Sequence, residues 1–263
     1  MLIPASIQKQ VNTACAVISR ILGRNLLAIH LYGSAVEGGL KPWSDIDLLV
    51  TTHQPLTPEQ RKALMEEILP LSASPGTSTC WRALEVTVVV YAVVAPWRFP
   101  PQREMQFGEW LREDIRSGIY EPAQPDCDLA ILLTHVRNAS VAVVGERADT
   151  LFEPVPQRDL VQTFRQTLEL WQAPGDLRGD ERNIILTLAR IWYSAVTGEF
   201  TAKDAAAEWL LPQLPDEHAA LLQAAQRDYL GLDTVDWTEA MSATERFVHY
   251  AKAAIVEQLP TCE

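Results

Sequence analysis

Two aspartates at the start of an apolar segment are the first candidates for chemistry. The segment 44–50 reads SDIDLLV, in which Asp45 and Asp47 are separated by one residue. Residues i and i+2 of a strand point to the same side, and two carboxylates held together at a buried strand repel each other. A divalent cation would relieve that repulsion, and Mg²⁺ prefers oxygen ligands and keeps substrate phosphates in its shell. The alternative is a pair of solvent-facing aspartates on an edge strand.

A glycine–serine pair lies upstream of the aspartates, directly after the strand-like segment 26–32. Gly33 would let the backbone approach a phosphate closely, and Ser34 adds a hydroxyl. A helix beginning there would add amide donors and a favourable dipole. Taken alone the pair could be an ordinary turn, but the combined spacing G-S-x₁₀-D-x-D favours a phosphate and metal site.

A third acid opens the segment RALEVTVVVY, in which Glu85 alternates with valines. If this segment forms a strand beside 45–50, Glu85 can reach Asp45 and Asp47. Three carboxylates around two Mg²⁺ ions suit an in-line phosphoryl or nucleotidyl displacement, and Glu85 could also take the proton from an acceptor hydroxyl. Otherwise it is a surface glutamate at a strand end.

Around these residues the first half of the chain alternates helical and strand patterns. Thr57 is expected to cap its helix, with Pro58 in the first turn. The expected helices span 5–22, 57–71, 106–118 and 125–137, and the expected strands span 26–32, 45–50, 83–94 and 141–146.

The second half contains only helical patterns, after a proline-containing linker at 151–159. Asp159 is expected to cap the first of these helices. They span 160–172, 180–197, 201–211, 215–230 and 237–259. The sequence therefore predicts an α+β fold: a mixed α/β domain over 1–157, with a mixed β-sheet and flanking helices, followed by an all-α helical bundle over 158–263.

Composition limits the classes of partner. The chain of 263 residues has a net charge of -12 and only 22 lysines and arginines, without a basic run. This argues against a nucleic-acid binder and favours a cationic partner, although the charge could serve solubility alone. No signal peptide or membrane span is recognisable, so we expect a cytoplasmic protein, and by default a monomer. The P-loop and nucleophile-elbow motifs are absent from the sequence.

Longer motifs give a family resemblance. The segments IHLYGSAVEGGLKPWSDIDLLV, RALEVTVV, PWRFPPQREMQFGEWLREDI and LTLARIWYSAVTGEFTAKDAAAEWLLPQLP resemble the aminoglycoside adenylyltransferases that modify streptomycin and spectinomycin, within the DNA polymerase β-type nucleotidyltransferase superfamily. The resemblance implies transfer of AMP from Mg-ATP to the 3″-hydroxyl of streptomycin and the 9-hydroxyl of spectinomycin. Pyrophosphate would be released and antibiotic resistance conferred.

The resemblance also implies roles for single residues. Asp45, Asp47 and Glu85 would hold Mg²⁺, with Glu85 as the catalytic base. The residues expected to bind ATP are Gly33, Ser34, Ser44, Asp128, Arg190, Lys203 and Tyr229. The residues expected to bind the drug, in a site between the domains, are Trp110, Trp171, Asp176, Asp180 and Asn183.

Chemistry supports these drug contacts, but each has an ordinary alternative. Asp176 and Asp180 can make charge-assisted hydrogen bonds to the guanidinium groups of streptomycin, and tryptophan faces suit a sugar or a cation. Equally, Trp110 and Trp171 could be core residues, Asp180 a helix cap, Asp176 a turn residue and Lys203 a solvated lysine. Asn183 can hydrogen-bond but cannot become cationic, so the preference between the two drugs is left open.

Two other functions compete with drug modification. The first is transfer of a nucleotide to a protein or to another small molecule, which label appearing on protein rather than on drug would favour. The second is a non-catalytic nucleotide sensor, which the intact set of Ser34, Asp45, Asp47 and Glu85 disfavours.

Overall fold

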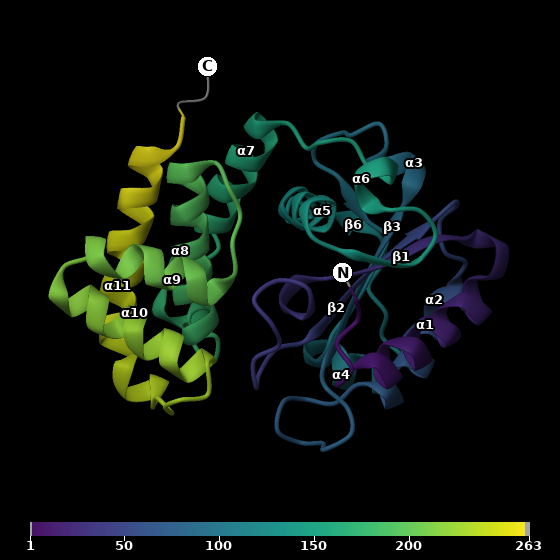
Figure 1. Cartoon of the computed structure of the whole chain (residues 1–263), viewed down its shortest axis with the longest axis horizontal. Helices are drawn as coiled ribbons and strands as arrows, with labels where there is room; N and C mark the ends of the chain where they lie inside the picture. Colours follow the sequence, from purple (N-terminus) through teal and green to yellow (C-terminus); the bar gives the residue numbers. More distant parts are fainter. Residues whose placement is uncertain (1, 261–263) are drawn as a thin grey trace. The chain divides into compact units, whose positions relative to one another are not determined.

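The computed structural model describes residues 2–260. The chain folds as two compact units, the first ending at Val155 and the second beginning at Pro156 (Figure 1). The first is a mixed sheet with flanking helices and the second is entirely helical, which confirms the predicted α+β fold. Within residues 2–260, no helix combines the length and the apolar character needed to cross a lipid bilayer.

The first unit is built on a five-stranded sheet in the order β5-β3-β2-β1-β7. Strands β2 and β3 run parallel, and the other neighbours in this sheet are antiparallel. The strands are β1 Leu26–Tyr32, β2 Ile46–Thr52, β3 Leu84–Val90, β5 Met105–Phe107 and β7 Val141–Val144. A small ribbon pairs β4 Gln102–Arg103 with β6 Gln124–Pro125.

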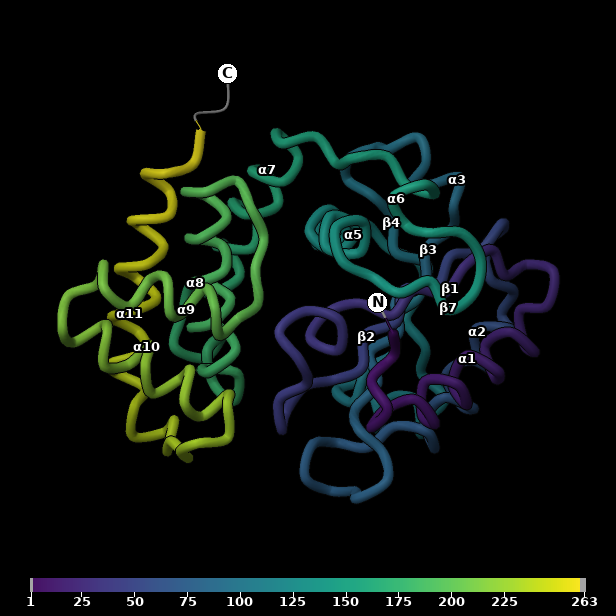
Figure 2. Tube along the Cα trace, in the orientation of Figure 1, coloured from purple at the N-terminus to yellow at the C-terminus, as the bar shows by residue number. Residues whose placement is uncertain are grey.

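One face of the sheet is covered by α1 Gln8–Leu22 and α2 Pro58–Ile68, which lie side by side (Figure 2). Alternate residues of the three central strands, such as Leu31, Leu48 and Val86, point into this layer and are fully or almost fully buried. Helix α2 begins as predicted: the Thr57 hydroxyl accepts from the Gln60 N–H, and Gln60 bonds back to the Thr57 N–H. This capping box satisfies two amides that the helix cannot pair internally.

The opposite face carries a smaller apolar cluster with α5 Leu129–Asn138 and α6 Ala148–Leu151. Tyr32, Leu49 and Val89 belong to this cluster. Because side chains alternate along a strand, the residues that share this face are Tyr32 of β1, Asp47 of β2 and Glu85 of β3. Asp47 and Glu85, which were singled out in the sequence, therefore lie on the α5 side of the sheet.

The second unit contains five α-helices within the described residues, in the number expected from the sequence. They are α7 Gln157–Leu168, α8 Glu181–Thr197, α9 Lys203–Leu210, α10 Asp216–Tyr229 and α11 Trp237–Gln258. Helix α8 packs against α9, α10 and α11. Its residues Ile184 and Leu188 are buried together with Phe247 of α11, so α8 is the central helix of the bundle.

Several predicted elements were wrong in extent. The strand expected over 83–94 ends at Val90 and is followed by the short helix α3 Tyr91–Val94. The helix expected over 106–118 is instead strand β5, a 3₁₀ turn and α4 Arg112–Arg116. Asp159 does not cap a helix, because α7 already begins at Gln157 after Pro156. Asp45 precedes β2, which begins at Ile46.

Candidate active site

Three polar residues form one row across the central strands. In the antiparallel β1–β2 pair Tyr32 lies opposite Asp47, and in the parallel β2–β3 pair Asp47 lies opposite Glu85. The strand of Glu85 therefore lies beside the strand of Asp47, as the sequence analysis required for Glu85 to reach the aspartates. Both carboxylate residues are half-buried, so they can hold a ligand while being supported by the sheet.

Asp45 and Ser44 stand in the loop just before β2. Ser44 is buried, and its side-chain oxygen accepts a hydrogen bond from the Lys41 N–H at 3.0 Å. The Ser44 N–H returns a bond to the Lys41 carbonyl at 3.1 Å. The turn from Lys41 to Ser44 therefore has a defined shape and delivers Asp45 to the start of the strand.

Gly33 lies directly against Asp47. It opens the 3₁₀ turn η2 Gly33–Ala35 with φ at 67°, and a Cβ built on it would lie 2.1 Å from Asp47 Oδ2. Glycine is needed here for backbone freedom and also for space. Ser34 follows within this turn, which is not continued into an α-helix, so the helical dipole considered in the sequence analysis is not available.

Two further residues of the site were missed in the sequence. Burial and the nearby charges of Asp47 and Glu85 raise the pKa of Tyr32 well above its ordinary value, so its phenol stays protonated beside the carboxylates. Gln106 of β5 donates from Nε2 to Glu85 Oε1 at 3.0 Å, which fixes the direction of that carboxylate. The alternation of Gln106 between the buried Met105 and Phe107 is the only sequence signal that could have indicated it.

The donor set suits Mg²⁺ chemically, because Asp45, Asp47 and Glu85 supply only oxygen ligands. Gly33 has no Cβ, which would otherwise lie 2.1 Å from the Asp47 carboxylate, so residue 33 leaves that oxygen accessible. Within residues 2–260, no three His, Cys, Asp or Glu side chains are gathered as a ready-made metal site. The magnesium ligands therefore stay a prediction.

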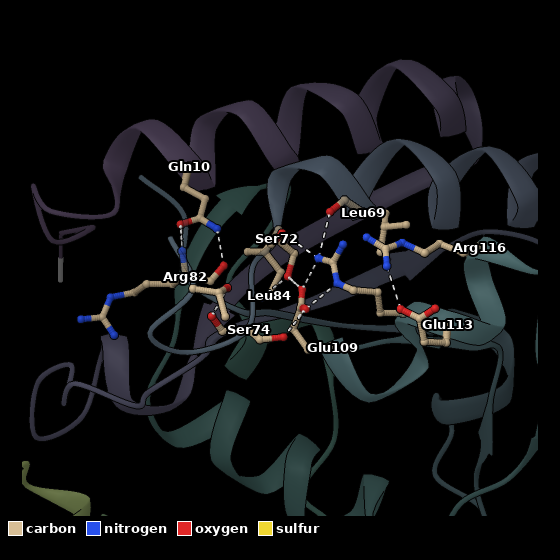
Figure 3. A network of polar contacts seen from close by, with 11 residues as sticks. Gln10, Leu69, Ser72, Ser74, Arg82, Leu84, Glu109, Glu113 and Arg116 are labelled. Carbon is tan, nitrogen blue, oxygen red and sulfur yellow. Dashed lines mark hydrogen bonds and ion pairs between the residues drawn. The ribbon is translucent and has the colours of Figure 1, made fainter. Parts of the chain in front are cut away.

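Trp110 stands on the segment after β5 and is 58% exposed, so it is not a core residue. Its ring lies over Gly108, where a Cβ would approach the ring to 2.2 Å. The neighbouring Glu109 is held by Arg112 through contacts of 2.8 Å and by the hydroxyls of Ser72 and Ser74 (Figure 3). This network anchors the base of an otherwise exposed tryptophan.

Glu109 is ionised in this network. Burial opposes its charge, but the hydrogen bonds from Arg112 and the two serines outweigh burial and hold the pKa of Glu109 below its ordinary value. The Ser72 hydroxyl also accepts from the Leu84 N–H at 3.0 Å. The start of β3, next to Glu85, is thereby tied to the segment that carries Trp110.

Asp128 stands at the N-cap position of α5, where its side chain makes no capping bond. It is exposed, and its backbone N–H donates to Asp126 Oδ1 at 3.0 Å. Since α5 covers the face of the sheet that carries Asp47 and Glu85, this helix end belongs to the same side of the first unit.

In the second unit, four predicted residues form one chain of contacts. Asn183 donates to Asp180 Oδ1 at 2.7 Å and accepts from Lys203 Nζ at 3.3 Å. The same ammonium lies 5.9 Å from the centre of the Tyr229 ring. Asp180 makes no capping bond with its side chain, so the helix-cap alternative does not describe it. Arg190 lies further along α8, half-buried.

Trp171 and Asp176 form a second group in this unit, in the segment between α7 and α8. Asp176 accepts from the N–H groups of Gln172 and Ala173 at 2.9 and 2.8 Å, and these bonds lower its pKa. Lys252 of α11 donates to the Trp171 carbonyl at 2.9 Å. Asp176 therefore is the turn residue considered above, but its carboxylate also stays ionised and accessible to a cation.

The first unit matches a known domain family. Residues 16–73, which include Gly33, Ser34, Asp45 and Asp47, match the nucleotidyltransferase domain family. Together with the row of carboxylates on adjacent parallel strands, this match defines the class: the protein is a nucleotidyltransferase.

The rest of the chain gives the particular family. Residues 150–254 match the C-terminal domain of aminoglycoside adenylyltransferases. An aminoglycoside (3'') (9) adenylyltransferase from Escherichia coli is 51% identical over 253 residues, 96% of each chain. A spectinomycin 9-adenylyltransferase from Staphylococcus aureus is 38% identical over 98% of each chain. This chain belongs to the aminoglycoside adenylyltransferase family.

A solved structure agrees with this assignment. The crystal structure of spectinomycin adenyltransferase AAD(9) from Enterococcus faecialis, with ATP and spectinomycin, superposes with a TM-score of 0.88 at 30% identity. The alignment covers 94% of this chain and 98% of that chain. The family resemblance described in the sequence analysis is therefore confirmed, and the protein is an adenylyltransferase.

Proposed function

We propose that this enzyme transfers AMP from Mg-ATP to the 3″-hydroxyl of streptomycin and the 9-hydroxyl of spectinomycin, and so confers resistance to both drugs. The observation that carries the proposal is the 51% identity to an aminoglycoside (3'') (9) adenylyltransferase along almost the entire length of both chains. The row of Asp47 and Glu85 on adjacent strands supports the same chemistry.

The reaction assigns a distinct task to Glu85. Its carboxylate accepts the proton of the drug hydroxyl while that oxygen forms a bond to the α-phosphorus of ATP. The bond from the α-phosphorus to the β-phosphate oxygen breaks, and pyrophosphate leaves. Gln106 donates to one oxygen of Glu85 at 3.0 Å and so fixes the direction of the carboxylate that takes the proton.

Asp45, Asp47 and Glu85 are the residues that would hold Mg²⁺. Two bound Mg²⁺ ions would supply charge stabilisation for the attacking and leaving oxygens of an in-line displacement. Tyr32 is a neutral phenol, and burial and the two neighbouring carboxylates raise its pKa further, so it adds no negative charge to this row.

The remaining groups bind the two substrates. The nucleotide phosphates would be met by Gly33, Ser34 and Ser44 in the first unit, and the proposal adds Asp128, Arg190, Lys203 and Tyr229 as further ATP contacts. The Asn183 amide bonds both Asp180 and Lys203. Asp180, a proposed drug contact, and Lys203, a proposed phosphate contact, are thereby adjacent within one helical unit.

Drug recognition would rest on charge and flat surfaces. Asp176 remains ionised because backbone amides lower its pKa, so it can pair with a guanidinium group of streptomycin. Asp180 offers a second carboxylate, and Trp110 and Trp171 offer ring faces to a sugar or a cation. The overall charge of -12 favours encounter with a cationic drug.

The test is mass spectrometry of the purified protein incubated with Mg-ATP and either drug. An AMP adduct on both drugs, absent with E85Q, is expected. Because the neutral amide keeps the shape of Glu85 but cannot accept the proton, E85Q should still bind ATP. AMP on protein instead of drug would favour a protein acceptor, and no transfer by a folded protein that binds ATP would refute the proposal.

A further inference from the structure

The loop that leads to Asp45 depends on an arginine outside the groups described so far. Between Ala35 and Ile46 the chain has no helix or strand, although Ser44 and Asp45 must be presented accurately. The local bonds between Lys41 and Ser44 shape the turn but do not attach it to the sheet. Contacts from other segments of the chain can fix where the turn lies.

Arg82 supplies such a contact. Its Nη1 donates to the carbonyls of Lys41 and Ser44, each at 2.9 Å, and approaches the Pro42 carbonyl at 3.4 Å. One guanidinium nitrogen thus joins both ends of the turn. The planar guanidinium holds its donors in fixed directions, so it specifies the position of the turn as well as attracting its carbonyl oxygens.

The backbone of Arg82 is itself fixed by Gln10 of α1. The Arg82 N–H donates to Gln10 Oε1 at 3.0 Å, and Gln10 Nε2 donates back to the Arg82 carbonyl at 2.8 Å (Figure 3). Gln10 is buried, with 4% of its surface exposed. A buried amide with satisfied partners has little freedom to move, so the base from which the Arg82 side chain extends is rigid.

The main chain then continues from Arg82 directly into the site. The carbonyl of the next residue, Ala83, accepts from the Ile46 N–H at 2.9 Å, and β3 begins at Leu84, immediately before Glu85. Arg82 therefore touches both sides of the site: its side chain holds the turn before Asp45, and its backbone leads into the strand of Glu85.

We infer that Arg82 is a positioning residue that sets Ser44 and Asp45 at their working distance from Glu85. It acts through these residues, by bonding backbone carbonyls, rather than by binding phosphate as a cation. For its catalytic consequences the inference rests on the proposed adenylyl transfer, since it assumes that Ser44 contacts phosphate and Asp45 a metal ion.

The experiment compares R82M, R82K and the control R116M. Methionine removes the donors, and lysine keeps the charge on a side chain one bond shorter that lacks the planar fork. Arg116 bonds Glu113 on the exposed surface of α4 and makes no contact with the turn. R116M therefore removes the same charge from the same unit without disturbing residues 41–44.

The first readout is steady-state kinetics with Mg-ATP and spectinomycin. We expect R82M and R82K to raise the KM for ATP about tenfold and to lower kcat about tenfold, with the KM for spectinomycin unchanged within about twofold. R116M should match the wild type. Simple loss of folded protein would lower the apparent kcat alone and would leave both KM values unchanged.

The second readout is hydrogen exchange of residues 36–45, which requires no turnover. Faster exchange of this loop in both Arg82 variants would support the inference even if the wild type modified neither drug. If R82K behaves like the wild type while R82M is impaired, the charge of Arg82 is what matters and the inference is overturned. Wild-type behaviour of both variants would also overturn the inference. If R82M does not fold, R82K decides by the same measurements.

Discussion

The contact between Gly33 and Asp47 allows a quantitative prediction for G33A. A methyl group at this position would lie 2.1 Å from Asp47 Oδ2, whereas ordinary contact begins at 3.4 Å, so the oxygen must withdraw by about 1.3 Å. Displacing a reacting group by about 1 Å can cost roughly 100-fold in rate. The positive φ adds a backbone cost of about 1–2 kcal/mol to the free energy of folding.

The control is G39A, which separates these two effects. Gly39 has φ at 80°, and a Cβ there would meet no atom within 4 Å. Both variants should therefore lose about 1–2 kcal/mol in urea unfolding, but only G33A should lose about 100-fold in kcat/KM for AMP transfer, measured by pyrophosphate release. Equal activity of the two folded variants would refute the argument that Gly33 is required to make space for Asp47.

Two further variants test the support of the site. Q106M removes the donor to Glu85 but keeps the side-chain length, so kcat should fall about 10- to 100-fold, as expected for a hydrogen bond to a charged group, with the KM for ATP unchanged. The matched control is Q124M, because Gln124 of β6 is also half-buried and bonds Glu121. Equal kcat values for Q106M and Q124M would contradict the role of Gln106. E109Q weakens the pairing with Arg112 and should lower the free energy of unfolding by about 1–2 kcal/mol at neutral pH. The pKa of Glu109 is lowered in the folded state. Its contribution to the free energy of unfolding is therefore present above the ordinary glutamate pKa and is lost as pH falls through the lowered value. Urea titrations in which the wild type and E109Q differ by a constant amount down to strongly acidic pH would exclude this account.

Local signals in the sequence were sufficient for many elements. Thr57 and Pro58 marked the start of α2, since a cap and a proline act on the residues next to them. The alternation around Glu85 placed it correctly on a strand, and the residues of the second unit were recognised as helical. In each of these cases the deciding interaction lies within a few positions of the residue concerned.

Interactions between distant segments could not be predicted in the same way. The position of Tyr32 opposite Asp47 depends on the antiparallel register between β1 and β2, which no local pattern specifies. Gln106 was placed in a helix, because a strand of three residues is too short for alternation to be recognised. Asp159 was expected to begin a helix that already starts at Gln157, since a preceding proline also permits helix entry.

The way Gln10 closes the segment between α2 and β3 has a consequence for sequence variation. Its side-chain amide donates to the carbonyls of Leu71 and Arg82, each at 2.8 Å, and so joins the two ends of that segment at its base. Residues 75–80 beyond this closure are exposed and include the free thiol of Cys80. Insertions, or a fluorescent label attached at Cys80, should therefore alter the tip of the loop without changing the separation of the two carboxylate-bearing strands.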